Sequence, residues 1–131
     1  MAKRYDSGPA LEPLKDFQKN TVDYIFNKMY ITNETDRFLV ADEVGLGKTL
    51  IARGLIAKAV EHCQDSIERF DIVYICSNGA IARQNMRKLN VLGNHDIAQL
   101  DRITMLPEKL NEILDHKGEY KSNINFISFS R

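Results

Sequence analysis

Four residues in one short stretch have the types and spacing of a phosphate-binding loop: Gly45, Gly47, Lys48 and Thr49. Glycine lets the backbone curl where a Cβ would obstruct it. A helix that begins there directs backbone N–H groups and its positive dipole end at an anion. A lysine at this place reaches the β- and γ-phosphates, and the threonine hydroxyl can ligate magnesium. We therefore expect a site for ATP and magnesium, with Lys48 as the catalytic cation and Thr49 as the metal ligand. The residues expected to contact the nucleotide are Val44, Gly45, Leu46, Gly47, Lys48, Thr49 and Leu50.

The elements on either side of this loop have the patterns that such a site needs. The apolar run from Phe38 to Ala41 predicts a short buried strand before the loop, and apolar residues at helical spacing predict a helix that begins near Gly47 or Lys48. Gly54 lies inside that helix and is expected to let it lie close to the sheet. The alternative is a chance occurrence of the glycines, lysine and threonine at the start of an ordinary helix.

The rest of the chain alternates between helical and strand patterns. We expect helices over residues 14–30, 80–89 and 107–116, and strands over residues 71–76 and 124–129. Residues 1–13 are predicted to be an irregular lead-in and residues 32–36 a polar loop, while residues 91–105 are ambiguous. In the helix over residues 80–89, the inward-facing side chains are expected to be Ile81, Ala82, Met86 and Leu89. This order predicts an α/β fold with a parallel sheet.

Composition restricts the broad class. The chain has 131 residues, 44% of them hydrophobic, with equal numbers of acidic and basic side chains, which suits one domain with a core. Cys63 and Cys76 form no CxxC pair, so we expect two buried thiols in a reducing cytoplasm. The sequence shows no signal peptide and no apolar run long enough for a membrane span, so no membrane partner is expected.

One departure from the general phosphate-loop pattern indicates a family. Asp42 stands where the first glycine of that pattern is usual, and the run from Ala41 to Thr49 resembles motif I of superfamily two helicases, most of all the Swi/Snf-like DNA translocases. The run from Leu14 to Gln18 resembles the Q motif, which implies that Gln18 reads the adenine edge. The alternative is a glutamine at the margin of the core that bonds to backbone. Tyr5 is a second candidate for adenine, by stacking, or part of a disordered terminus.

A further segment is similar to motif Ia of the same family, in which a strand end and the following helix face nucleic acid. It comprises residues 74–79 and Gln84. The resemblance implies phosphate contacts from Ser77, Asn78, Arg83 and Arg87. A solvated helix face after an ordinary turn is the alternative. Residues 125–130 look like the strand that leads to the next conserved segment.

The resemblance implies a partial RecA-like parallel sheet flanked by helices, in an ATPase that couples hydrolysis to movement on nucleic acid, with DNA favoured over RNA. It also implies a second RecA-like lobe and a bacterial, cytoplasmic location. The family also has a pair of carboxylates, the Asp–Glu box, at the end of a later strand, and the sequence does not contain it. Asp115 is the nearest candidate, but it falls in a helical pattern. We therefore expect residues 14–131 to be the amino-terminal part of the ATP-binding domain, truncated before that box and inactive alone. The alternatives are a non-hydrolysing nucleotide-binding module and an unrelated P-loop kinase, and Gln18 and Asp42 favour the helicase over the kinase.

Overall fold

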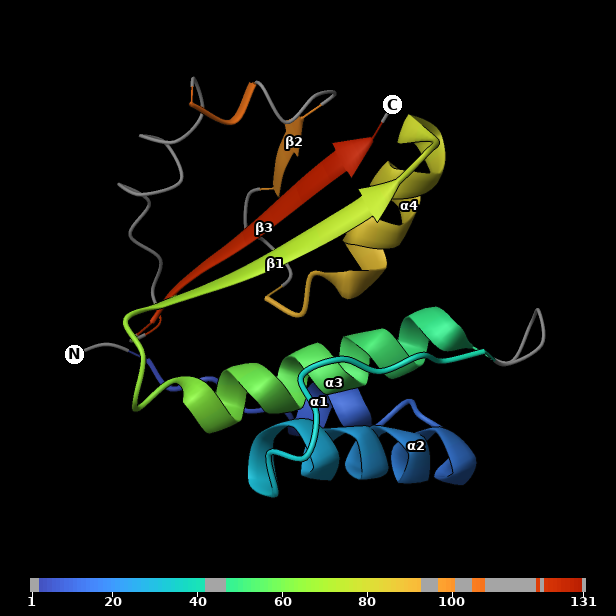
Figure 1. Ribbon diagram of the computed structural model, residues 1–131, viewed down its shortest axis with the longest axis vertical. Helices are drawn as coiled ribbons and strands as arrows, with labels where there is room; N and C mark the ends of the chain where they lie inside the picture. Colours follow the sequence, from blue (N-terminus) through green and yellow to red (C-terminus); the bar gives the residue numbers. More distant parts are fainter. Residues whose placement is uncertain are drawn as a thin grey trace.

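A computed structural model of the chain describes residues 3–41, 47–92, 97–100, 105–107, 120 and 122–130 (Figure 1). It is a mixed α/β structure in which helices pack against a parallel sheet. The helices are α1 (Gly8–Leu11), α2 (Asp16–Phe26), α3 (Lys48–Cys63) and α4 (Gly79–Leu89), with a π-helical turn η1 (Asn27–Ile31) directly after α2. The strands are β1 (Arg69–Cys76), β2 (Ile97–Leu100) and β3 (Asn123–Ser130).

Within the described residues the sheet has three strands in the order β1-β3-β2, and both pairings are parallel. Ile72 of β1 lies beside Phe126 of β3, and Leu100 of β2 lies beside Phe129. The predicted parallel sheet and the predicted strands at 71–76 and 124–129 are confirmed. β2 falls in the stretch that the sequence left ambiguous. The carboxyl ends of β1 and β3 reach the same edge of the sheet (Figure 1).

The two faces of the sheet differ in how they are covered. One face packs on α3 and α4 in a core that includes Phe126, Ile124, Ala57, Val60, Met86 and Leu89. On the other face, Ile127 and Leu100 form a smaller cluster with Met105 and Leu106. On that same second face β1 remains largely open, because Val73 is 49% exposed and Ile75 is 78% exposed.

The helices α2 and α3 run side by side in the same direction below the sheet (Figure 1). Their interface buries Leu14, Val22, Ile25 and Ile51. Gly54 permits this close approach, since a Cβ there would lie 2.9 Å from Leu14 Cδ1 and 3.0 Å from Val22 Cγ2. The sequence predicted that Gly54 would let α3 approach the sheet. The structure shows that it faces α2 and the segment before it.

The expected strand from Phe38 to Ala41 does not form, since residues 37–41 are irregular. Leu39 is 83% exposed, Phe38 packs edge-on against Tyr24 with ring centroids 5.8 Å apart, and Val40 packs against the α2–α3 interface. A strand needs a hydrogen-bonded neighbour, and β3, the inner strand, pairs with β1 and β2 instead. A run of four apolar residues does not by itself distinguish a strand from a segment packed on helices.

The amino-terminal segment is also more ordered than predicted. Tyr5 is buried at 6% exposure, and its backbone is held by Gln64 through Tyr5 N–H to Oε1 (2.8 Å) and Nε2 to the Tyr5 carbonyl (3.0 Å). Residues Gly8–Leu11 form the short helix α1 rather than an irregular lead-in. Tyr5 is therefore a core residue and is not accessible for stacking on a ligand.

The remaining predictions have mixed outcomes. The helix expected over residues 14–30 is confirmed as α2 and η1, and the helix over residues 80–89 as α4, with Ala82, Met86 and Leu89 inward. Ile81 was predicted to face inward but is 49% exposed, because it lies on the solvent side of α4. Most of the helix expected over residues 107–116, including Asp115, lies outside the described residues. None of the described helices is long and apolar enough to cross a membrane.

Candidate functional site

The start of α3 has the backbone geometry that the glycine-rich motif predicts. Gly47 is the N-cap residue and adopts a left-handed conformation, with φ of 78° and ψ of 39°. Side chains other than glycine rarely adopt this region, so the residue type is required by the turn. Lys48 begins the helix and Thr49 follows it in the first turn. Asp42, Glu43 and the predicted contacts Val44, Gly45 and Leu46 lie outside the described residues.

The electrostatics of this helix start favour an anion. An α-helix leaves its first N–H groups without intrahelical acceptors and carries a positive partial charge at this end. The N-cap glycine has no side chain to accept from them, and the first turn of α3 contains no acidic residue. The Lys48 side chain is exposed and Thr49 is half-buried. Leu50 is half-buried and packs against the α2–α3 interface.

Gln18 lies directly against this turn. It is 5% exposed, and its Oε1 accepts a hydrogen bond of 2.8 Å from the Lys15 backbone N–H. Its Nε2 lies 2.3 Å from the place that a Cβ on Gly47 would occupy. The bond to backbone that the sequence allowed as an alternative is therefore present. The approach to Gly47 was not predicted, because helical periodicity places Gln18 on the apolar face of α2 without showing which element it meets.

The predicted nucleic-acid residues lie at the carboxyl edge of the sheet, where β1 passes into α4. Ser77 and Asn78 are exposed, and the Asn78 Oδ1 caps α4 by accepting from the Ala80 N–H (2.9 Å) and the Ile81 N–H (3.1 Å). A Cβ on Gly79 would lie 3.4 Å from Ser130 Oγ and 3.5 Å from an Arg83 terminal nitrogen.

This edge is basic and accessible along the outer face of α4. The exposed side chains Arg83 and Arg87 lie one turn apart on α4, which contains no acidic residue. The structure thus brings Ser77, Asn78 and Arg83 together with the end of β3 and places Arg87 one turn further along the helix. Ser130 is a neighbour that the sequence reasoning missed.

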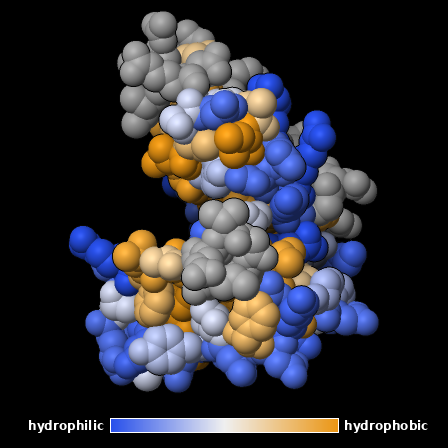
Figure 2. Space-filling model, turned by 90° about the vertical axis from the view of Figure 1, so that its right-hand side faces the viewer, coloured by the Kyte–Doolittle hydropathy of each residue, from blue (hydrophilic) through white to orange (hydrophobic). Residues whose placement is uncertain are grey.

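Both candidate regions are on one side of the molecule. The starts of α2 and α3 and the start of α4 all lie toward the right of Figure 1, and Figure 2 looks onto that side. The helical layer below and the sheet and α4 above both show apolar surface there (Figure 2). The exposed large apolar side chains include Phe17, Phe38 and Leu39 near the helical layer and Ile75 and Ile81 above it.

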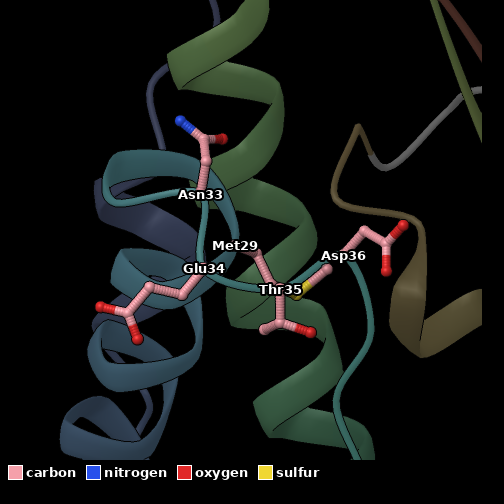
Figure 3. A pocket seen from close by; sticks show the side chains of 5 residues that line it. All are labelled: Met29, Asn33, Glu34, Thr35 and Asp36. Carbon is pink, nitrogen blue, oxygen red and sulfur yellow. The ribbon is translucent and has the colours of Figure 1, made fainter.

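A separate surface pocket lies at the polar loop after η1 (Figure 3). It has a volume of about 470 Å³ and is lined by Met29, Asn33, Glu34, Thr35 and Asp36. Lys28 Nζ lies 2.5 Å from Glu34 Oε2, and this hydrogen bond lowers the pKa of Glu34. The carboxylates of Glu34 and Asp36 point to opposite sides (Figure 3). They do not converge on one point, and the pocket contains none of the predicted site residues.

Cysteine and metal chemistry add no further site in the described part of the chain. There, no group of three or more histidine, cysteine or acidic side chains could hold a metal ion. Cys63 and Cys76, predicted to be buried thiols, are free and half-buried. Partial burial raises the pKa of the Cys63 thiol, which disfavours the reactive thiolate.

A scan of protein-family models, a search of curated proteins and a search of solved structures each returned no match to this chain. The resemblance to superfamily two helicases therefore depends on the motif residues and on the local geometry around them.

Proposed function

We propose that this chain is the ATP-binding part of an ATP-driven nucleic-acid motor with a RecA-like core. The observation that carries the proposal is the start of α3: a left-handed Gly47, followed by Lys48 and Thr49, with the Gln18 amide packed against it. A motif match by chance would require neither a left-handed glycine nor a buried glutamine from the neighbouring helix α2 at that point.

The residues at this turn fit a magnesium nucleotide. The N–H groups of the first turn of α3 and the positive helix end would bind the phosphates. The Lys48 ammonium would neutralise charge on the β- and γ-phosphates, and the Thr49 hydroxyl would ligate magnesium. Bound magnesium would offset the charge that develops on the phosphates during hydrolysis. Gln18 would keep its bond from the Lys15 N–H, since a carboxamide oxygen has a second lone pair and Nε2 is a separate donor, but its nearly buried side chain would have to become accessible to reach adenine.

The carboxyl edge of the sheet would bind the nucleic-acid backbone, with DNA favoured over RNA. Ser77 and the amide nitrogen of Asn78 would donate to phosphates, while Arg83 and Arg87 would supply charge. Hydrolysis between this lobe and a second RecA-like lobe would drive movement along the strand. A bacterial, cytoplasmic setting is part of the same proposal.

The nucleotide site is tested by titrating the protein with a fluorescent ATP analogue and magnesium. We expect saturable binding that Lys48→Ala abolishes and that Lys28→Ala preserves, because Lys28 lies in η1, where it is paired with Glu34, at the other end of α2 from the contact between Gln18 and Gly47. Circular dichroism should show that all three proteins are folded. A folded parent that does not bind, or equal binding by Lys48→Ala, would refute the site.

The non-hydrolysing alternative is tested by the rate of phosphate release with and without DNA when the second lobe is present. If DNA stimulates phosphate release and the Lys48→Ala substitution abolishes it, the result supports a motor. Binding without stimulated release favours the non-hydrolysing module.

The nucleic-acid surface is tested by fluorescence anisotropy with single-stranded DNA at several salt concentrations. The double variant Arg83→Ala/Arg87→Ala should bind more weakly and should reduce the salt slope by roughly 1.4, about 0.7 for each lost phosphate contact. Arg4→Ala removes a surface arginine that is paired with Asp65 and serves as the matched control. An unchanged slope in the double variant would place the DNA elsewhere.

A further inference from the structure

Arg53 connects the helix of the proposed nucleotide site to the helix of the proposed nucleic-acid edge. It lies in α3, and its Nη1 donates a hydrogen bond of 3.0 Å to the backbone carbonyl of Lys88, in the last turn of α4. The two residues are 35 positions apart in the chain, so the packing of the helices brings them together. Arg53 is half-buried. This polar contact therefore joins the two elements that carry the candidate sites.

The Lys88 carbonyl is a group for which such a donor matters. The last four carbonyls of an α-helix have no intrahelical N–H to accept from. In α4 the Asn90 N–H bonds to the Met86 carbonyl, and Arg53 supplies a donor for Lys88. A cation is also favoured at the negative end of the helix dipole, and a charged donor makes a stronger hydrogen bond. Arg53 thus holds one end of α4, while the Asn78 cap holds the other.

The direction of this contact distinguishes it from the apolar packing around it. The core between the two helices includes Ala57, Val60 and Met86, and apolar attraction is non-directional. A hydrogen bond requires a defined distance and angle. Arg53 therefore fixes the position of α4 along α3 in a way that the apolar core alone does not.

Arg53 is also close to the proposed phosphate turn. It follows Lys48 by about one and a half helical turns, or about 7.5 Å along the axis of α3. A helix transmits a displacement over this length as a rigid element. At the other end of the contact, Lys88 directly follows Arg87, one of the cations proposed to contact nucleic acid. A movement of the phosphate turn on nucleotide binding would thus reach the basic face of α4 through Arg53.

We propose that Arg53 is a positioning residue that couples nucleotide binding at the start of α3 to nucleic-acid binding on α4. This inference rests on the proposed function and deepens it, because it names a residue through which one site acts on the other. Coupling is reciprocal, so nucleotide should change the affinity for DNA by the same factor by which DNA changes the affinity for nucleotide. We expect a factor of about five or more in the parent protein.

Substitutions of Arg53 should change this coupling factor. Arg53→Ala removes the bond to α4 and should bring the factor to within about twofold of one. Arg53→Lys keeps a charged donor and should restore part of the factor. Lys58→Ala is the matched control, because Lys58 is a cation of the same helix but pairs with Asp23 of α2. It removes the same charge, and the factor should stay at the parent value.

The experiment measures the affinity for single-stranded DNA by fluorescence anisotropy, with and without a saturating, non-hydrolysable ATP analogue and magnesium. Titration of the fluorescent ATP analogue with and without DNA gives the reciprocal factor. Circular dichroism should show that every variant is folded. Because the factor is a ratio of two affinities of one protein, a loss that weakens both affinities equally cancels.

Several results would overturn the inference. If the parent binds nucleotide and DNA but neither changes the affinity for the other, the coupling is absent and the proposed sites stand. If Arg53→Ala keeps the parent factor, with or without an equal loss of both affinities, the coupling does not pass through Arg53. An equal fall of the factor in Lys58→Ala would show that charge on α3, rather than the contact with α4, is responsible. A parent that binds no nucleotide would refute the proposed nucleotide site and the inference with it.

Discussion

Replacing Gly47 with alanine should destabilise the protein through two separable effects. An alanine in the left-handed region costs about 1–2 kcal/mol relative to glycine, and Gly47 has a φ of 78°. The new Cβ would also lie 2.3 Å from Gln18 Nε2, which must move. Displacing that side chain breaks the hydrogen bond from the Lys15 N–H to Gln18 Oε1, a loss of about 1 kcal/mol. The free energy of unfolding should therefore fall by about 2–3 kcal/mol.

Urea denaturation followed by circular dichroism measures this change. With the slopes usual for small domains, the midpoint should fall by roughly 1–2 M. Gly79→Ala is the matched control at the start of a helix, because a Cβ there would meet Ser130 Oγ at an ordinary 3.4 Å and Gly79 has no positive φ. Its unfolding free energy should stay within about 0.5 kcal/mol of the parent value.

The double variant Gln18→Ala/Gly47→Ala separates the two effects. Once the Gln18 carboxamide is gone, the steric part of the Gly47→Ala cost disappears and the backbone part remains. The combined loss should be smaller than the sum of the single losses by about 1 kcal/mol. Strict additivity, or a Gly47→Ala protein as stable as the parent, would refute the contact between Gln18 and the left-handed turn.

Substitutions at three further positions test other parts of the structure. Burial raises the pKa of Tyr5 to about 12 from 10.0, so the stability that its neutral phenol confers is complete below pH 10 and is lost as the pH rises toward 12. Because the Tyr5 hydroxyl has no hydrogen-bond partner in the described structure, Tyr5→Phe should keep stability at pH 7 and flatten alkaline unfolding in a pH titration by circular dichroism. Asn78→Ala removes the cap of α4 and should cost about 1 kcal/mol in urea denaturation, whereas Asn78→Asp should not. Gly54→Ala forces a Cβ to within 2.9 Å of Leu14 Cδ1, and such overpacking costs about 1–3 kcal/mol of stability. The higher helix propensity of alanine offsets up to about 1 kcal/mol of this cost, so the melting temperature should fall.

The longer helices, whose apolar residues recur at regular spacing, are the part of this fold that the sequence predicts well. The helical pattern over residues 14–30 predicted α2, which buries Val22 and Ile25, and the inward positions of Ala82 and Met86 in α4 were predicted correctly. Both helices are long enough for several turns to indicate the same buried face, so one apolar residue outside the pattern does not change the predicted helix. Ile81 shows the limit, because a single apolar residue at the margin of the pattern faces solvent.

Short segments and long-range contacts were predicted poorly for a physical reason. The run from Phe38 to Ala41 satisfies a strand pattern locally, but a strand exists only with a paired neighbour, and pairing is not encoded in four residues. The burial of Tyr5 depends on Gln64, which is far away in the sequence. The contact of Gln18 with Gly47 likewise arises from the packing of α2 on α3, and no local pattern contains it.

That contact determines how the two halves of the proposed site depend on each other. Gln18 touches the turn expected to bind phosphates and also holds the first turn of α2. A change at Gln18 therefore disturbs the phosphate turn and the base position together, so Gln18→Ala should weaken ATP and tripolyphosphate binding. Unchanged binding of inorganic tripolyphosphate by Gln18→Ala would refute this dependence of the phosphate turn on Gln18.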